Sequence, residues 1–589
     1  MNRISILVIG ALFTLSGCEK FIEPAPVNNG EYEDIYTQPT LAHGILLNGY
    51  TRLPSNSWSF DDVATDDAVS NDINNGFRRA ATGQWSAQNN PFDRWQNARA
   101  GIQYMNLFLA EAEKVNWDTK NPMVSTMFKD RYMGEAYGLR AYFMFYLLQA
   151  HAGWSNGELY GFPLILDFET PASDVNKPRA TFEDCMKQIY SDLNKAEELL
   201  PLDYKQAAAS DVPAKYSGVT PETYNRVFGQ QFKQLMTRRI AKAIRAKASI
   251  LAASPAYSTG NTTTWEMAAN HAADVLNANQ WLTNFDITGH VWYEKDKVDP
   301  LGSGATPAEV LWRTNIATNS DLEAAHYPPS LQGQGRLNPT QNLVDAFPMA
   351  NGYPITNTAL SGYNPATPYV GRDPRLTRSI VYNKNTSGPT NVQINTTADA
   401  TGTTATDRLD GLNKTETSTR TGYYMKKLLR QDVSRAGTVN NQKHYKPHIR
   451  YTELFLIYAE AANEAWGPMG TGGHPHSAYD IIKRIRSRAG ITGGDAYLES
   501  IKNDKDAMRT LIRNERRLEL AFEGFRFWDI RRWNEDLDNA AKGMRITQNS
   551  SVYQVFDVEA RAFEDFMRFG PIPYSETLKF NALQQNTGW

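Results

Sequence analysis

One segment in the N-terminal third of the chain has the spacing of a helix that is apolar on nearly every side. Its first face carries side chains at intervals of three and four residues: Met133, Tyr137, Ala141, Met144 and Leu148. Its second face carries another apolar set: Tyr132, Leu139, Phe143 and Tyr146. Because a helix that is apolar all round must be surrounded by other elements, we expect residues 133–148 to lie inside a helical core.

Helical periodicity continues over the rest of the chain. It predicts helices near residues 95–109, 181–200, 235–254, 265–278, 451–466, 477–489 and 505–526. Many of these segments are rich in alanine, which favours close pairing of helices, and alternating strand patterns are few. We therefore predict a mainly α fold of antiparallel helix pairs. Long insertions, where binding sites often lie, are expected over residues 50–94, 201–234, 282–375 and 383–422.

The composition suits a large folded protein and argues against nucleic acid as a partner. The 589 residues are 41% hydrophobic, and 61 Lys and Arg are interspersed with 64 Asp and Glu, for a formal net charge of -3. Proteins that bind nucleic acid instead carry a basic patch or stripe. Since the chain has two cysteines, a disulfide framework and a cysteine-based zinc site are both excluded.

The N-terminus has the features of an export signal. A basic residue precedes an apolar run over residues 4–15, and Leu-Ser-Gly-Cys follows, ending at Cys18. The run is too short to span a bilayer, and Leu-Ser-Gly-Cys resembles the bacterial lipobox, in which the cysteine becomes the acylated first residue. We expect a signal peptide over residues 1–17, lipid attachment at Cys18 and a tether over residues 18–30. A soluble secreted protein is the alternative.

The two cysteines are expected to have separate roles. Several acyl chains on Cys18 would anchor the protein to a membrane without crossing it, and no later window of the sequence reaches about 18 apolar residues. Cys185 shares a helical stripe with Phe182, Ile189 and Leu193. This spacing predicts a small buried side chain at Cys185.

The sequence contains no recognisable catalytic or metal-binding motif. It lacks a Gly-x-Ser-x-Gly elbow, a Gly-x-x-x-x-Gly-Lys phosphate loop and a His-Glu-x-x-His zinc helix. The pairs His444/His448 and His474/His476 come closest to metal spacing, but each pair encloses a proline, which disfavours a shared helical face. Adjacent acids occur, and their separation in the fold decides whether they could act as a glycosidase pair. We predict no enzyme, no metal and no cofactor.

A charged segment near the C-terminus has the pattern of a structural helix. Within residues 505–526, Leu511 and Leu518 share one face, arginines lie opposite, and glutamates line the border. Arg516 and Glu519 are three residues apart, which predicts an ion pair. Because acids balance the bases, an ion-paired structural helix is favoured over nucleic-acid binding.

The same segment carries a resemblance to a known family. Residues 513–533 contain Glu-Arg-Arg-Leu-Glu-Leu followed by Arg-Phe-Trp-Asp, and this block resembles the signature of the SusD/RagB family, outer-membrane lipoproteins of Bacteroidota. Further matches lie at residues 134–142, 339–347, 372–376, 486–490, 571–573 and 585–589. The resemblance implies tetratricopeptide-like helix pairs with loop insertions that form a ligand-binding face. It implies an N-terminal SusD-like region over residues 31–234 and a C-terminal region over residues 235–589.

The resemblance also implies a function. Family members cap a SusC-type TonB-dependent transporter, capture oligosaccharides at the cell surface and pass them to the transporter, while some members handle peptides. For this chain it implies a lipid-anchored glycan-binding protein of the outer membrane, with an oligosaccharide or polysaccharide as ligand and a SusC-like transporter as partner. A peptide-binding member of the family and an exported glycoside hydrolase are the alternatives, and surface or periplasmic orientation stays open.

Two aromatic-rich loop regions are the predicted ligand-binding face. Sugar rings stack their C–H faces on aromatic planes, and their hydroxyl groups bond to Asp, Asn and Arg. In the family the glycan platform is commonly built from an early and a middle loop region, which these two resemble in position. The predicted ligand-binding residues are Trp58, Asp66, Asp67, Arg78 and Trp85 in the first region and Trp292, Trp312 and Tyr327 in the second.

Overall fold

The computed structural model of the protein describes residues 32–589. The expected signal peptide, the lipid-attachment residue Cys18 and the expected tether lie outside the described residues. Over residues 32–589, no helix combines the length and the apolar character that crossing a bilayer requires.

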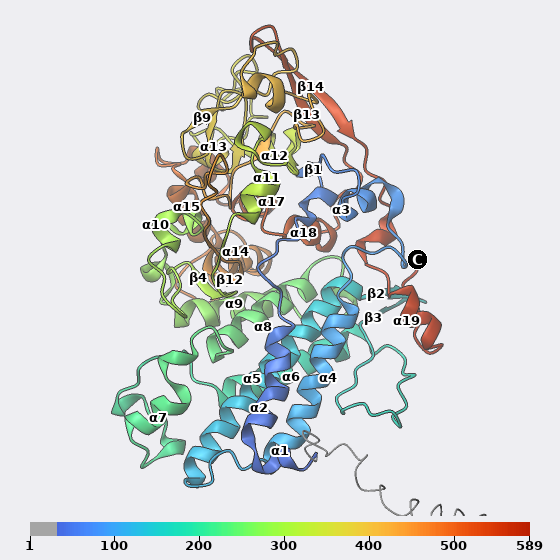
Figure 1. The fold of residues 1–589 in the computed structure, drawn as a ribbon, viewed down its shortest axis with the longest axis vertical. Coiled ribbons are helices and arrows are strands. Elements are labelled where there is room, and N and C mark those ends of the chain that lie inside the picture. The colour runs from blue at the N-terminus through green and yellow to red at the C-terminus, as the bar shows by residue number, and fades with distance from the viewer. Residues whose placement is uncertain (1–31) are drawn as a thin grey trace, which may run out of the picture.

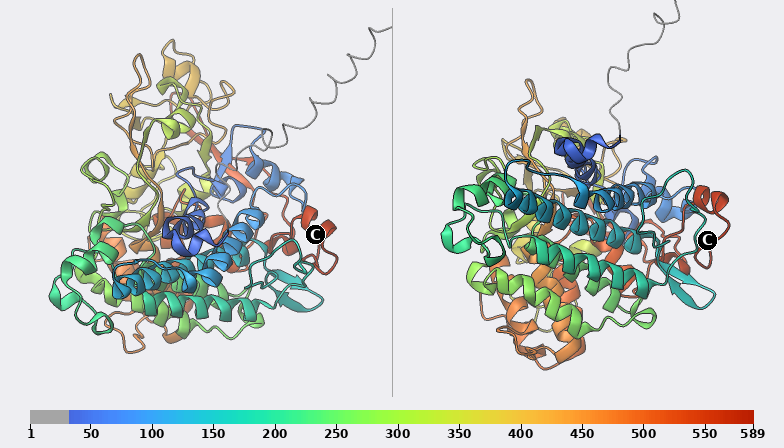
Figure 2. Two further views of the ribbon diagram at one scale, coloured as in Figure 1. Left: turned by 60° about the horizontal axis from the view of Figure 1, so that its bottom comes forward. Right: turned by 90° about the horizontal axis from the view of Figure 1, so that it is seen from below.

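An array of packed helices forms one half of the molecule, mainly in the lower part of Figure 1, and its last helices extend into the upper part. Its main helices are α2 (Pro39–Thr51), α4 (Trp95–Glu111), α5 (Pro122–His151), α6 (Phe182–Leu199), α8 (Arg238–Ala253), α9 (Trp265–Ala278), α14 (Tyr451–Trp466), α15 (Ala478–Ala489) and α17 (Lys505–Glu519). From α2 to α14, each helix packs against the next in this order, and α14 also packs against α15 and α17. Seen from below, the helices lie in successive layers (Figure 2). The predicted mainly α fold of packed helices is confirmed.

Helix α5 lies inside this array, as its sequence predicts. Asn121 caps its first turn by accepting two backbone hydrogen bonds, and Pro122 occupies the first helical position. Most of its remaining side chains are buried. A Cβ atom on Gly138 would lie 2.6 Å from Cγ of Met236. The absence of a side chain at Gly138 therefore allows the neighbouring segment to pack directly against α5.

The core of the array is continuous from α2 to α17. Helix α8 contributes six fully or almost fully buried alanines: Ala241, Ala243, Ala246, Ala248, Ala252 and Ala253. These small side chains let α8 approach α6 and α9 closely. Cys185 of α6 is buried in the same core, which confirms its predicted place. The core runs across residue 234, where we expect the boundary between the two regions, and that division stays a prediction.

A loop-rich body forms the other half of the molecule (Figure 1). Within residues 32–589, the strands of the loop-rich body and of the loops in the helical array pair as seven two-stranded antiparallel sheets. The strands are β1 (Ala68–Ser70), β2 (Gly153–Ser155), β3 (Glu158–Tyr160), β4 (Val310–Arg313), β5 (Ala317–Asn319), β6 (Leu337–Pro339), β7 (Ile380–Val381), β8 (Thr386–Ser387), β9 (Val392–Gln393), β10 (Tyr424–Met425), β11 (Gln442–His444), β12 (Pro447–Arg450), β13 (Ala541–Thr547) and β14 (Val552–Glu559). A second hydrophobic cluster, which includes Phe347, Tyr423 and Phe522, stabilises this body.

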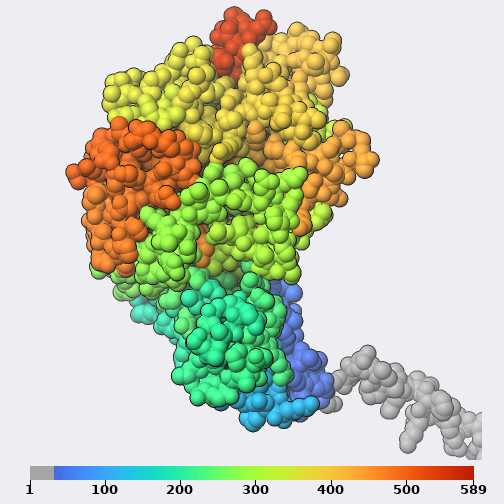
Figure 3. Space-filling model, turned by 90° about the vertical axis from the view of Figure 1, so that its left-hand side faces the viewer, coloured from blue at the N-terminus to red at the C-terminus, as the bar shows by residue number. Residues whose placement is uncertain are grey.

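The remaining helices are short and lie mainly in the connections. They are α1 (Asp34–Thr37), α3 (Gly76–Arg79), α7 (Pro221–Phe228), α10 (Lys295–Val298), α11 (Asp321–His326), α12 (Gln341–Ala346), α13 (Pro374–Ser379), α16 (Ala496–Ile501), α18 (Arg526–Arg532) and α19 (Tyr574–Lys579). Figure 3 shows one face of the molecule, where the segment near residue 300 (green) lies above the segment near residue 210 (teal). Residues of both segments line an open groove of about 910 Å³.

Most predicted helices match the structure to within a few residues. The prediction over residues 505–526 is wrong at its C-terminal end, because α17 ends at Glu519. Phe522 and Gly524 adopt left-handed backbone conformations, with φ angles of 64° and 79°, which an α-helix cannot contain. The insertion at residues 201–234 contains α7, which the sequence pattern did not predict.

The charged segment is a structural helix, but its ion pairs differ from the predicted one. Arg516 donates to Asp529 at 2.7 Å and not to Glu519. Glu519 instead accepts from Arg375 at 3.0 Å and from Arg488 at 2.9 Å. These partners come from distant parts of the chain, so the segment joins the helical array to the loop-rich body.

Candidate functional site

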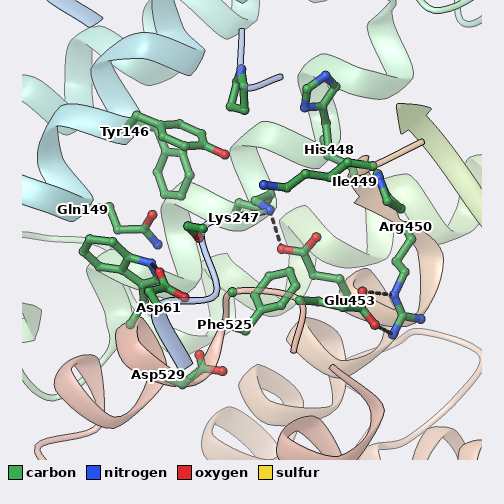
Figure 4. A pocket seen from close by; sticks show the side chains of 18 of the residues that line it. Asp61, Tyr146, Gln149, Lys247, His448, Ile449, Arg450, Glu453, Phe525 and Asp529 are labelled. Carbon is green, nitrogen blue, oxygen red and sulfur yellow. Dashed lines mark hydrogen bonds and ion pairs between the residues drawn. The ribbon is translucent and has the colours of Figure 1, made fainter. Parts of the chain in front are cut away.

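The two halves of the molecule meet at a cavity of about 400 Å³ (Figure 4). The helical array contributes side chains from α5, α8 and α14. The loop-rich body contributes strand β12 and the segments 54–61 and 523–532. Small-ligand sites commonly have volumes of about 300–1,000 Å³. The open groove of about 910 Å³ also falls in this range, but the aromatic residues that line it are buried. The junction cavity carries partly exposed rings and is therefore the candidate functional site.

Four aromatic side chains of the junction cavity are only partly buried: Trp58, Tyr146, Phe525 and Trp528. Tyr146 extends from the C-terminal part of α5, and Phe525 lies in the loop before α18 (Figure 4). Trp58 is supported by the buried Trp292, whose ring centroid lies 6.4 Å away at an interplanar angle of 27°. Partly exposed, rigidly supported rings are suitable surfaces for stacking a ligand.

Arg94 packs against two of these rings. Its guanidinium carbon is 4.4 Å from the ring centroids of both Tyr146 and Trp528, and such cation–π contacts contribute about 0.5–2 kcal/mol each. Its Nη1 donates to Oε1 of Gln149 at 2.7 Å. Among residues 32–589, no carboxylate forms an ion pair with Arg94. The two rings and a neutral amide thus hold this cation in the cavity wall.

Lys446 is the second cation of the cavity without an acidic partner. Its Nζ lies 5.0 Å from the Trp58 ring centroid and donates to the carbonyl oxygen of Ser57 at 3.2 Å. No carboxylate in the described part of the chain lies within ion-pair distance of this amine. Burial lowers the pKa of Lys446 to about 8, with Arg94 adding to the decrease and Asp61 opposing it.

Asp61 is an acid of the cavity that lacks an ion-pair partner. Its Oδ2 accepts a hydrogen bond from Nε1 of Trp528 at 3.1 Å, and within residues 32–589 its Oδ1 has no hydrogen-bond partner. Burial raises the pKa of Asp61, while Arg94 and Lys446 oppose the rise. Two cations and one acid therefore interact through space here without direct pairing.

The opposite wall of the cavity carries a paired acid. Nζ of Lys247 donates to Oε1 of Glu453 at 2.5 Å and lies 5.4 Å from the Phe525 ring centroid (Figure 4). Burial and the nearby charges of Lys446 and Lys247 lower the pKa of His448 to about 3. Its imidazole is therefore neutral at physiological pH and can both donate and accept hydrogen bonds.

Buried ion pairs fix the position of the cavity wall. Arg450 donates to Glu309 and to Glu523, each at 2.7 Å. Arg532 donates to Glu460 at 2.6 Å. All of these side chains are almost fully buried. Because removing one partner of a buried pair costs about 3–5 kcal/mol, these contacts keep the two halves of the molecule in one arrangement.

The predicted aromatic residues have different places in the structure. Trp58 lines the junction cavity. The other four lie in hydrophobic cores, with exposed fractions of 5% for Trp85 and 1% for Trp292, Trp312 and Tyr327. These four rings do not form an open loop platform in the structure: Trp292, Tyr327 and Trp85 lie in cores that the long insertions form, and Trp312 lies in the core of the helical array. A ring that is enclosed in this way has no face available for a sugar.

The predicted polar residues are held by partners within the protein. Asp66 accepts from Arg517 and Arg526, each at 2.9 Å, and Asp67 accepts from Arg517 at 2.6 Å. Burial alone would raise the pKa of Asp66, but the two arginines hold it below its usual value. Arg78 donates to a glutamate of β14 at 2.7 Å. These three residues therefore join loops of the body and lie outside the junction cavity.

Sequence reasoning misses most residues of the junction cavity. Tyr146 lies on the helix that is predicted to be buried all round, and Trp528 lies in the block that resembles a family signature and is expected to be structural. Arg94 and Lys446 belong to no motif. These side chains come from four distant segments of the chain, so no local pattern connects them.

The chemistry of the cavity suits a polar ligand with an extended face. Partly exposed rings supply stacking surfaces, and the Gln149 amide, the His448 imidazole and the Asp61 carboxylate supply hydrogen-bonding atoms. In the described chain, no three or more His, Cys, Asp or Glu side chains are placed to hold a metal ion.

Comparison with known proteins finds relatives along nearly the whole chain. A family model described as "SusD family" matches residues 297–589. A second model, described as "Starch-binding associating with outer membrane", matches residues 35–217. The SusD-like protein P38 of Formosa agariphila is 21% identical over 570 residues, which cover 94% of this chain and 95% of that protein.

Solved structures share the fold at low sequence identity. A SusD-like protein of Bacteroides fragilis has a TM-score of 0.70 and 21% identity, covering 95% of this chain and 99% of that one. A SusD-like carbohydrate binding protein of the same species has a TM-score of 0.66 and 19% identity, covering 94% and 100%. A laminarin binding SusD-like protein has a TM-score of 0.56 and 18% identity, covering 93% and 99%. At these identities the likeness establishes the fold.

Proposed function

Because the chain belongs to the SusD/RagB family of carbohydrate-binding proteins, we propose that it captures an oligosaccharide in the junction cavity and delivers it to an outer-membrane TonB-dependent transporter of the SusC type. The proposed role is binding and release without hydrolysis. Lipid attachment at Cys18 would hold the protein at the outer membrane.

The observation that carries this proposal is the set of partly exposed rings around hydrogen-bonding groups. Trp58 presents a supported aromatic surface, while Gln149 and His448 offer polar atoms that can orient hydroxyl groups. A sugar ring needs both features, one for its C–H face and one for its hydroxyl edge. The cavity volume of about 400 Å³ limits the enclosed part of the ligand to a short stretch of sugar units.

The outer-membrane location and the transporter partner rest on the family. The description of the N-terminal family model includes association with the outer membrane, and one structural neighbour is a laminarin-binding protein. These findings support a glycan as ligand. Of the residues predicted to bind it, the proposal retains Trp58 and assigns the other seven to the scaffold.

A peptide-binding role and a glycoside hydrolase activity are the competing functions. In the cavity, Glu453 is already paired with Lys247, and Asp529 is paired with Arg516. A hydrolase needs two acids, one carboxylic acid and one free carboxylate, across the scissile bond, and Asp61 is the single acid of the cavity without an ion-pair partner in the described chain. We therefore favour binding without turnover.

The proposal is tested by titrating the purified mature chain with a panel of neutral and acidic polysaccharides and with mixed peptides. We expect binding to at least one glycan without release of reducing ends. Trp58→Ala is expected to weaken that binding about tenfold, equivalent to about 1.4 kcal/mol, because a stacking surface is lost.

The matched control is Trp265→Ala, which removes a partly buried tryptophan from the start of α9, outside the cavity. This variant is expected to bind like the wild type. Glycan binding that is equally strong in Trp58→Ala would place the site elsewhere. Binding to peptides alone, or clear production of reducing ends, would overturn the proposed function.

A further inference from the structure

The junction cavity contains more unpaired positive than negative charge. Six of its lining side chains are Lys or Arg, and four are Asp or Glu. Most of these groups are in ion pairs, such as Lys247 with Glu453. Of these charged groups of the cavity, Arg94, Lys446 and Asp61 form no ion pair with any residue among 32–589. Two cations therefore face a single acid.

The neutral acceptors of these cations leave their charge uncompensated. Lys446 donates to one backbone carbonyl, and Nη1 of Arg94 donates to the Gln149 amide. Taking an ammonium group out of water without a counter-charge is costly, and the lowered pKa of Lys446 reflects that cost. An anion that entered the cavity would remove much of this cost.

The geometry around Arg94 restricts how such an anion could bind. The rings of Tyr146 and Trp528 both pack against its guanidinium group. Nη1 makes the hydrogen bond to Gln149, whereas Nε and Nη2 make no hydrogen bond with the described residues. An oxyanion would therefore meet Arg94 edge-on, in the plane in which guanidinium groups bind carboxylate or sulfate oxygens.

The position of Lys446 relates this charge to the proposed sugar-binding surface. Its ammonium group lies 5.0 Å from the Trp58 ring centroid, and it is close enough to Arg94 and Asp61 for each of them to affect its pKa. A ring stacked near Trp58 would bring a substituent of that ring within reach of Lys446. Stacking surface and positive charge thus lie side by side.

Resting on the proposed function, we infer that the captured glycan is acidic, and that a uronate carboxylate or a sulfate ester of the sugar binds Lys446 and the free edge of Arg94. Asp61, whose Oδ1 has no partner in the described chain, accepts a hydrogen bond from a neighbouring hydroxyl group. Carboxylate and sulfate share the chemistry that these cations recognise, and the experiment separates them.

The test uses glycan pairs that differ in charge and share a backbone. Oligogalacturonate is compared with its methyl ester, and dextran sulfate with dextran, by calorimetric titration of the mature chain at low and high salt. We expect the acidic member of at least one pair to bind at least tenfold more tightly than its neutral counterpart. This preference should decrease as salt increases, because screening weakens the charge contacts.

Variants then assign the preference to the proposed residues. Lys446→Met is expected to reduce acidic-glycan affinity at least tenfold, whereas Lys446→Arg retains most of it. Arg94→Gln is a second, independent variant with the same expected loss. Lys426→Met is the matched control, since Lys426 is also half-buried and donates to neutral acceptors, Oδ1 of Asn385 and the Thr386 carbonyl, outside the junction cavity.

The outcomes distinguish this inference from the proposed function. Equal affinity for charged and neutral partners, or binding of neutral glycans such as laminarin alone, would overturn the inference and leave glycan capture intact. Unchanged acidic-glycan binding in folded Lys446→Met and Arg94→Gln would also overturn it. If no glycan of either kind binds, the proposed function fails and the inference fails with it. If polyglutamate, an acidic peptide, bound as tightly as the acidic glycan, that result would overturn both the inference and the proposed function in favour of peptide binding.

Discussion

Two groups of buried or partly buried charges lie where the helical array meets the loop-rich body, and they differ in how the charges are compensated. In the first group, which we call the paired network, Arg375 donates to Asp373, Glu515 and Glu519 at 2.6, 2.8 and 3.0 Å. Arg486 donates to the same Glu515 at 2.7 Å. Each cation in the paired network thus contacts at least one carboxylate directly.

The junction cavity contains the second group, in which direct pairing is missing. Arg94 and Lys446 donate to neutral oxygens, and Asp61 accepts from an indole. The aromatic residues show the same contrast, because Trp312 is enclosed in the core while Trp58 is partly exposed. Complete internal satisfaction marks groups that stabilise the fold, whereas incomplete satisfaction marks groups that remain available to a ligand.

The largest expected effect tests the paired network. Arg375→Met would leave three buried acids without a shared cation, and breaking such contacts costs about 3–5 kcal/mol. We expect the free energy of unfolding, measured by urea denaturation with tryptophan fluorescence, to decrease by this amount. Glycan binding by the folded fraction should change less than twofold, since Arg375 lies outside the cavity.

Arg378→Met is the matched control for this prediction. Arg378 lies on the same short helix, α13, but its side chain is exposed. We expect the control to change the free energy of unfolding by less than about 1 kcal/mol. Equal losses in the two variants would contradict the view that compensation in the paired network stabilises the fold.

Acid is the second way to test the paired network. Burial alone would raise the pKa of Glu519, but Arg488, Arg375 and Arg450 lower it to about 2 from its usual 4.5. As pH decreases below 4.5, the unfolded chain takes up this proton before the folded chain does. The stabilisation by Glu519, about 3 kcal/mol, should therefore be fully present above pH 4.5 and be lost as pH decreases toward 2.

The measurement is the free energy of unfolding between pH 6 and pH 3. Glu519→Gln is expected to be less stable than the wild type at pH 6 and to show a shallower decrease with acid, because a group that titrates in this window has been removed. Parallel pH profiles for the two proteins would show that Glu519 does not contribute to acid sensitivity.

The fold was largely predictable because helix formation depends on local spacing. The prediction for α14 agrees with the structure at both ends, and the all-round apolar pattern of α5 corresponds to its place inside the array. The end of α17 was not predictable, because it depends on left-handed conformations at Phe522 and Gly524. The Glu519 pairing was missed for a similar reason, since its partner Arg375 is 144 residues away.

The candidate site was much less predictable than the fold. Aromatic residues in long insertions suggested exposure, but Trp85 and Trp292 became parts of cores that only the tertiary structure defines. The charges of the cavity also depend on distant neighbours. Whether Lys446 is paired cannot be read from its surrounding sequence, and its closest aromatic partner, Trp58, lies several hundred residues earlier in the chain.

The smallest expected effect tests the unpaired side of the comparison, through the pH dependence of binding. Burial and Arg94 lower the pKa of Lys446 to about 8 from its usual 10.5, Asp61 opposes this decrease, and the neighbouring His448 stays neutral above pH 6. In the free protein the amine is therefore protonated below pH 8 and increasingly neutral above it. An acidic glycan needs the protonated form, so its affinity should be constant near pH 6–7 and about tenfold weaker at pH 9.

Titrations of the acidic glycan at pH 6.5, 7.5 and 9.0 measure this dependence, with Lys446→Arg as the control. Because a guanidinium group keeps its charge over this whole range, the affinity of the variant should stay flat. A wild-type affinity that is equally flat would show that Lys446 does not contact the anion. A decrease shared by both proteins would assign the titration to another group, and the contrast between paired and unpaired charges would then not explain ligand selection.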